Sequence, residues 1–150
     1  MTAVALTATA MVTAPASAKT ITLHYFLKQV TVKFTDAAGH AKNHHKQPAT
    51  GDIGDQIGLG YAGNHNNHAK RWTVSFHLRC VFRSSKRARC DAQLAVGGSM
   101  LLFNGTSPNF GDKVNRLTIN GGTGVFQRAH GTMTAVSPGK NLDVTIRVRV

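Results

Sequence analysis

The stretch Asn120–Gly131, NGGTGVFQRAHG, holds four of the chain's fifteen glycines and decides how the fold is interpreted. A phosphate-binding loop needs glycines that end a strand and open a helix, so that the helix amides meet the phosphate. The residues after Gly124, VFQRAHGTMTAV, have the composition of a strand, and the sequence has no Gly-Lys-Ser or Gly-Lys-Thr motif. The segment Gly121–Gly124 is therefore interpreted as a turn between two strands, where glycines supply positive φ without steric cost.

Apolar and polar residues alternate along most of the chain from Thr20 onward. Residues 72–82, WTVSFHLRCVF, and residues 142–150, LDVTIRVRV, alternate without interruption, as half-buried strands do. In residues 20–34, TITLHYFLKQVTVKF, the alternation changes phase after Leu27. This shift predicts a bulge or bend within one long strand.

Residues 51–61, GDIGDQIGLGY, are a weaker strand candidate, because glycines separate the apolar residues. The whole pattern gives about eight strands with turns at hairpin spacing, and no convincing helix after Lys19. Strands so regular need closed edges, which predicts an all-β fold, an eight-stranded antiparallel β-barrel; a β-sandwich is the alternative. A barrel of this size is either filled by side chains or holds one small ligand, so its lumen is the expected place for function.

The first 18 residues are uncharged and rich in Ala and Thr, and Ala16-Ser17-Ala18 has the pattern that signal peptidase reads. We therefore expect a signal peptide over residues 1–18 and one secreted β-barrel domain over residues 19–150. The basic region of a signal is missing, so the signal is interpreted as truncated at its start. A cytosolic protein with a disordered tail is the alternative. The apolar run is shorter than the roughly 20 residues that cross a bilayer, so no transmembrane span is expected.

The chain is strongly basic, with 18 Lys and Arg residues against six carboxylates, all of them Asp, and a net charge of +12. Such a charge attracts polyanions, and the attraction weakens with salt. General solubility is the alternative explanation, because the cations are scattered along the sequence. The two cysteines, Cys80 and Cys90, are expected to form a disulfide across a hairpin in an exported protein. Metal binding by the two thiols alone is the weaker interpretation.

The segment LTINGGTGVFQRAHGTMTA, residues 117–135, resembles the signature of the allene oxide cyclase and dirigent barrel superfamily. Members carry a hydrophobic strand, then G-G-T/A-G, an aromatic residue two positions on, and Ala-x-Gly before the next strand. Further landmarks, such as the Gly54-Asp55 strand opening and Cys80, follow in order, so that the resemblance covers about residues 51–136. The matching motif positions are Gly121, Gly122, Thr123, Gly124, Phe126, Ala129 and Gly131.

The resemblance implies an eight-stranded barrel, often a homotrimer, with a hydrophobic cavity. Plant allene oxide cyclases cyclise an unstable fatty-acid epoxide by holding one conformer, and dirigent proteins steer the coupling of phenoxy radicals. The resemblance therefore favours a secreted barrel that binds a small apolar or phenolic molecule in its lumen and directs the stereochemistry of a cyclisation or coupling. The alternative is a non-catalytic secreted protein whose basic surface binds acidic polymers. The candidates for lining the lumen are Tyr25, Trp72, Phe76, Phe103, Phe126 and Met133.

The catalytic groups of these relatives do not carry over. The lumenal glutamate of the plant cyclases has no counterpart, because the chain contains no Glu. Dirigent proteins place an acidic residue after the G-G-T turn and an Arg within Ala-Arg-Gly, where this chain has Gly124 and His130. His130 is the remaining candidate for proton donation near neutral pH. Whether the protein is an enzyme stays open at this point.

Two loops are rich in histidine, and their imidazoles would bind a transition metal if the loops met at one barrel mouth. The sequence has neither an H-x-H nor an HExxH motif, so solvated loops are favoured and no cofactor or metal is expected. Arg147 and Arg149 share one face of the last strand and form either a clamp for an acidic ligand or a solvated outer face. The loop histidines are His40, His44, His45, His65 and His68.

Overall fold

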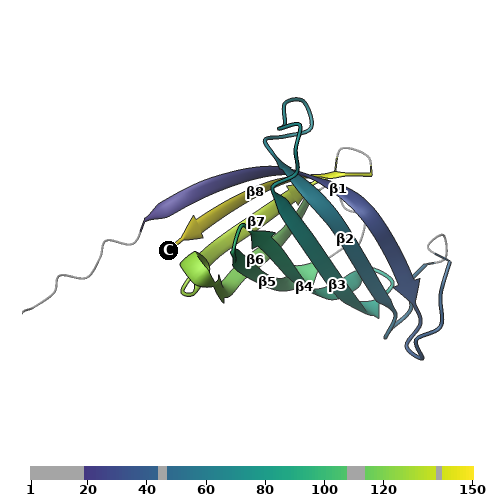
Figure 1. Ribbon diagram of the computed structural model, residues 1–150. Helices are drawn as coiled ribbons and strands as arrows, with labels where there is room; N and C mark the ends of the chain where they lie inside the picture. The colour runs from purple at the N-terminus through teal and green to yellow at the C-terminus, as the bar shows by residue number, and fades with distance from the viewer. Residues whose placement is uncertain (1–18, 44–46, 108–113, 138–139) are drawn as a thin grey trace, which may run out of the picture.

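The computed structural model describes residues 19–43, 47–107, 114–137 and 140–150. Eight strands form a closed antiparallel barrel in which each strand pairs with the next and β8 closes onto β1 (Figure 1). The predicted barrel is confirmed. The part of the chain described contains no helix long and apolar enough to cross a membrane. The elements are β1 (Thr20–Thr35), β2 (Ile53–Ala62), β3 (Val74–Ser84), β4 (Arg87–Val96), β5 (Ser99–Ser107), β6 (Val114–Thr123), the 3-10 helix η1 (Gly124–Phe126), β7 (His130–Val136) and β8 (Leu142–Arg149).

Strand β1 contains the predicted bulge. Its pairing with β2 passes from Gln29 to Thr31, which places Val30 at the bulge with its side chain 65% exposed. Before the bulge Leu27 is buried, and beyond it Phe34 packs against the core from a position of opposite parity. An extra residue in one strand shifts every later side chain to the other face, which explains the change of phase in the sequence.

The stretch that predicted a hairpin does connect two antiparallel strands, but the turn comes later than expected. Gly121 and Gly122 belong to β6, and the chain then forms η1 before β7 begins at His130. The reason is a close approach: a Cβ atom at Gly122 would overlap the carbonyl oxygen of Met100 in β5. The glycines therefore let the connection fold onto the barrel, where Phe126 joins the core with 5% of its side chain exposed.

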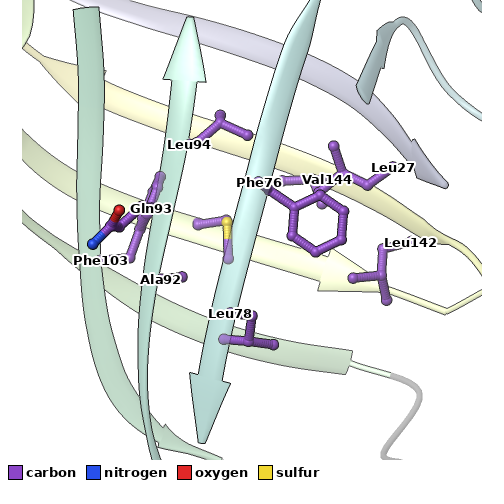
Figure 2. A pocket seen from close by; sticks show the side chains of 10 residues that line it. Leu27, Phe76, Leu78, Ala92, Gln93, Leu94, Phe103, Leu142 and Val144 are labelled. Carbon is purple, nitrogen blue, oxygen red and sulfur yellow. The ribbon is translucent and has the colours of Figure 1, made fainter. Parts of the chain in front are cut away.

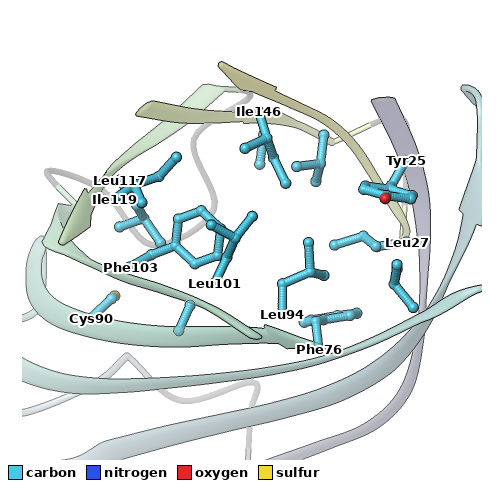
Figure 3. Packing of buried hydrophobic residues seen from close by; sticks show 14 of the residues in the cluster. Tyr25, Leu27, Phe76, Cys90, Leu94, Leu101, Phe103, Leu117, Ile119 and Ile146 are labelled. Atoms are coloured by element: carbon cyan, nitrogen blue, oxygen red, sulfur yellow. The ribbon is translucent and has the colours of Figure 1, made fainter. Parts of the chain in front are cut away.

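The core fills the inside of the barrel with apolar side chains from every strand except β2 (Figure 3). Strand β4 shows the usual alternation, because Leu94 and its inward neighbours are buried while the residues between them are mostly exposed. Strand β2 is inverted: Gly58 and Gly60 face inward, and Ile57 faces outward with 50% exposure. A Cβ at Gly58 would overlap the ring of Phe76, so glycine here makes room for a side chain from β3.

Cys80 and Cys90 lie directly opposite each other in the β3–β4 pair and form the predicted disulfide. Both are buried within the core. The prediction of a bridge across a hairpin is therefore confirmed. Because both sulfur atoms are used in the bond, the alternative of a thiolate metal site does not apply.

Candidate functional site

A small apolar cavity lies among the side chains that line the lumen (Figure 2). Its volume is about 30 Å³, and six of the eight strands contribute to its wall. This is room for about two water molecules and is far below the roughly 300 Å³ of a small-ligand pocket. A larger guest would have to displace side chains. The lining residues, all apolar except Gln93, are Leu27, Phe76, Leu78, Ala92, Gln93, Leu94, Phe103, Met133, Leu142 and Val144.

Three of the lining candidates from the sequence, Phe76, Phe103 and Met133, meet at this cavity although they come from three different strands. Phe126 is buried, but it belongs to η1 and is not part of the cavity wall. Trp72 lies outside the core, with 57% of its side chain exposed. Trp72 precedes Val74, the first residue of β3. The alternation of inward and outward side chains in that strand therefore does not apply to Trp72.

Tyr25, another lining candidate, lies beside the cavity. It faces the lumen from β1, two residues before Leu27, and pairs with Val144 of β8, and both of these residues line the cavity. Burial raises the pKa of the Tyr25 phenol above its usual value. The phenol therefore stays neutral and can donate a hydrogen bond to a guest. Its neighbour His24 points outward, where its Nδ1 lies 3.2 Å from the hydroxyl of Thr145.

Gln56 is a lumenal polar residue that the sequence reasoning missed. It is 9% exposed on the inner face of β2, and the Nε2 of Gln29 donates a 3.5 Å hydrogen bond to its Oε1. The signal was present in the sequence, because Gln56 has the same parity as Gly54, Gly58 and Gly60. The sequence alone does not show that these glycines face inward, because this depends on the side chains of β3 that pack against them.

His130, the weak catalytic candidate, does not face the lumen. It begins β7 opposite Arg149, and its side chain is exposed on the outer face of the barrel. The inward residue is its neighbour Gly131, where a Cβ would overlap the carbonyl oxygen of Arg147. The position that holds Arg in the dirigent motif is thus an outer-surface position in this chain.

The first histidine-rich loop is closed by contacts between His40 and the Asp36 carboxylate. The Nδ1 of His40 lies 3.1 Å from Oδ2 of Asp36, and the His40 amide donates a 2.9 Å hydrogen bond to Oδ1 of the same carboxylate. These hydrogen bonds to the charged form hold the pKa of Asp36 below its usual value. His44 and His45 lie outside the described residues.

The second histidine-rich loop folds back onto the outer wall of the barrel. The amide of His65 donates a 2.7 Å hydrogen bond to Asp143 of β8, and its imidazole contacts the same carboxylate. His68 packs on the rings of Phe26 and Tyr61, at centroid distances of 4.7 and 5.5 Å. Among the residues that can be placed, no three His, Cys, Asp or Glu side chains are grouped as metal ligands would be.

No protein-family model matches the sequence, and no curated protein matches it. Solved structures do. A structure named pyocyanin demethylase superposes with a TM-score of 0.67 at 13% identity, over 85% of this chain and 99% of that one. The pterocarpan synthase dirigent protein GePTS1 gives 0.67 at 15%, over 97% and 96% of the two chains. A second such protein, PsPTS1, gives 0.64 at 18%, over 87% and 94%.

This chain has the closed eight-stranded barrel fold of these structures. At these identities the likeness establishes the fold, and it agrees with the resemblance carried by Asn120–Gly131. The barrel of this chain places Gly124 at the start of η1 and His130 on the outer wall. Neither position supplies a charged group to the cavity.

Proposed function

We propose that this barrel binds a small apolar or phenolic molecule in its lumen and holds it in one conformation. The observation that carries the proposal is the apolar cavity within the lumen, with the Tyr25 phenol beside it. The similar structures support it, because they are named as a demethylase of pyocyanin and as pterocarpan synthases of the dirigent type. A shared barrel is consistent with a shared location for ligands.

Binding requires the lumen to open, and the cavity wall indicates where it can do so. Leu78, Met133 and Leu142 are only half-buried, whereas Phe76 and Phe103 are buried. Methionine is unbranched and adapts its shape readily, so it can move aside at modest cost. A guest would therefore enter past these three side chains and rest against the two phenylalanine rings.

The proposed role is conformational selection rather than acid–base catalysis. Of the described buried residues, the polar ones besides Tyr25 are Gln56 and Asp52, and the Asp52 carboxylate is held by Lys42 and by the amide of Ala49. A neutral phenol orients a guest through a hydrogen bond to an oxygen atom. Binding that favours one conformer directs the stereochemistry of a reaction that proceeds without further catalysis.

Titration of the labelled protein with toluene and p-cresol, followed by NMR, tests the proposal. We expect saturable shifts at Phe76 and Phe103, and affinity about tenfold weaker in Ala92→Leu, because the added side chain fills the cavity. Asp91→Leu, on the outer face of the same strand and away from the cavity wall, is the matched control. Leu78→Ala enlarges the cavity and is expected to bind at least as well as the wild type. An absence of saturable binding in both the wild type and Leu78→Ala would end the proposal.

We further propose that the protein acts outside the cell. The Cys80–Cys90 disulfide supports this location, since structural disulfides persist in oxidising compartments. Sequencing the amino terminus of protein recovered from the culture medium is the direct measurement. A start at Lys19 is expected, and recovery of an uncleaved chain inside the cell would contradict it.

A further inference from the structure

We propose that the tip of the β3–β4 hairpin is a binding site for an anionic polysaccharide. The segment from Arg83 to Arg89, RSSKRAR, contains four cations in seven residues and no acidic residue. All four cationic side chains are exposed. A short segment so rich in Lys and Arg has the charge density of a polyanion site. We call Arg83, Lys86, Arg87 and Arg89 the basic tip.

The hairpin presents these cations on its outer side. Phe82 and Ala88 pair across the two strands, and both side chains are fully buried. Arg87 and Arg89 flank Ala88 on β4, so alternation directs both toward solvent on the same face. Two residues along a strand span about 7 Å, and neighbouring strands are about 5 Å apart. The basic tip is thus a compact cluster rather than a charge spread over the barrel.

The hairpin is also braced. The Cys80–Cys90 disulfide joins its two strands next to the Phe82–Ala88 pair. The backbone of Phe82 exchanges two 2.8 Å hydrogen bonds with the loop before β2, accepting from the amide of Gly51 and donating to the carbonyl of Asp52. A site held in place before the ligand arrives loses less conformational entropy on binding. The disulfide therefore has a role in recognition as well as in stability.

The cations of the basic tip are available to a ligand. Within the described residues, no ion pair involves any of them, although four carboxylates elsewhere are paired. The nearest acid along the strand is Asp91, on the outer face two residues after Arg89 and exposed. Arginine binds the oxygens of sulfate and carboxylate groups with paired hydrogen bonds, which gives orientation as well as affinity.

The chemistry of the tip favours a polysaccharide among polyanions. Single-stranded nucleic acids gain much of their affinity by stacking bases on aromatic side chains, and between Arg83 and Arg89 there is none. Membrane-surface sites insert large apolar side chains, and this segment has none either. Ser84 and Ser85 lie between Arg83 and Lys86, and their hydroxyls can form hydrogen bonds with the hydroxyls of a sugar chain.

Two double variants of the full chain test the proposal, with dextran sulfate and polygalacturonate as probes and neutral dextran as the blank. Arg87→Gln with Arg89→Gln removes two charges from the basic tip. Arg147→Gln with Arg149→Gln removes two charges from the outer face of β8 at the same spacing. We expect the first variant to bind the probes about tenfold more weakly and the second to stay within about twofold. Equal losses in both would show that net charge alone drives binding and would overturn the site.

Further measurements separate this site from its competitors. Binding to the polysaccharides is expected to weaken linearly in log–log plots against salt, with a shallower slope for the tip variant because fewer counterions are released. Tighter binding of the wild type to single-stranded DNA or to anionic vesicles than to either polysaccharide would overturn the choice of ligand. The tip variant is expected to bind toluene as the wild type does, so failure here and failure of the lumenal proposal are distinguishable.

Discussion

Strands β2 and β4 have the same length and the same alternation, yet they face the lumen in opposite ways. In β4 the apolar Leu94 points inward and Arg89 outward, which is the usual arrangement. In β2 the inward positions include Gly58 and Gly60, and Ile57 points outward. The comparison teaches that alternation identifies a strand, whereas the face that lies inside depends on what the neighbouring strands supply.

Side chains of β3 and β1 fill the space next to the glycines on the inner face of β2. A Cβ atom at Gly58 would overlap the ring of Phe76, and one at Gly60 would overlap side-chain atoms of Val74 and Leu27. Protein interiors are packed to nearly constant density, so a glycine-lined strand must be filled by its neighbours. Strand β4 thus contributes its own apolar side chains to the core, whereas the inner face of β2 is packed by side chains of its neighbours.

The largest expected effect tests which apolar residues stabilise the barrel. Leu94→Ala removes a buried side chain of β4 and is expected to lower the free energy of unfolding by about 2 to 5 kcal/mol. Ile57→Ala removes a half-exposed side chain of β2 and is expected to cost less than about 1 kcal/mol. Urea denaturation of both variants measures the difference. Equal losses would mean that the outer face of β2 is as important for stability as the inner face of β4.

The next effect concerns the disulfide that links β4 to β3. Reducing the Cys80–Cys90 disulfide removes the constraint on a short loop, and we expect the free energy of unfolding to fall by about 3 kcal/mol. Denaturation with and without reductant, with thiol titration to confirm reduction, measures it. An unchanged midpoint in the fully reduced protein would show that hairpin pairing alone holds β3 to β4.

A methyl group added to β2 tests the inversion directly. Gly58→Ala is expected to destabilise the barrel by about 1 to 3 kcal/mol, because the new Cβ meets Phe76 and the backbone carbonyl oxygen of Lys28, which cannot yield easily. Gly98→Ala is the matched control, since open space surrounds that position. Denaturation midpoints give both values. A neutral Gly58→Ala would mean that the inner face of β2 has room to spare.

The smallest expected effect concerns how β2 begins. The amide of Ala49 donates a 2.7 Å hydrogen bond to the Asp52 carboxylate, and Lys42 pairs with it, so the pKa of Asp52 lies below its usual value. The resulting stability is present above the unfolded-state pKa of about 4 and is lost as the pH falls through the folded-state value. We expect the urea concentration at the unfolding midpoint of the wild type to decrease as the pH is lowered below about 4. The decrease is expected to be smaller for Asp52→Asn. Parallel pH profiles would contradict this.

Several features of the fold were predictable because they depend on local sequence. The bulge at Val30 follows from a change of parity, and the disulfide follows from hairpin spacing between Cys80 and Cys90. The start of β7 was placed too early, since residues with strand composition after Gly124 fold into η1 against β5 and β6. Trp72 was misjudged for a related reason: it has the parity of β3 but precedes the pairing that orients a side chain. Assembly into a homotrimer stays a prediction.

For the candidate site, the sequence indicated that Phe76, Phe103 and Met133 would face a lumen, and all three line the cavity. It gave no means of knowing that the cavity is only about 30 Å³, because free volume is the small remainder after many side chains have packed. The sequence shows the four cations of the basic tip, but only the structure shows that a disulfide and backbone hydrogen bonds brace the hairpin that carries them.

The sequence by itself determined the strands, their antiparallel order and the eight-stranded barrel, because period-two alternation and hairpin turns act between near neighbours in the chain. Only the tertiary structure decided which face of β2 lies inside, that His130 points outward and that Tyr25 stands beside the cavity. These outcomes depend on the register between strands and on the size of the side chains that neighbouring strands place in the lumen. Such quantities arise from contacts between distant parts of the chain and leave no local pattern.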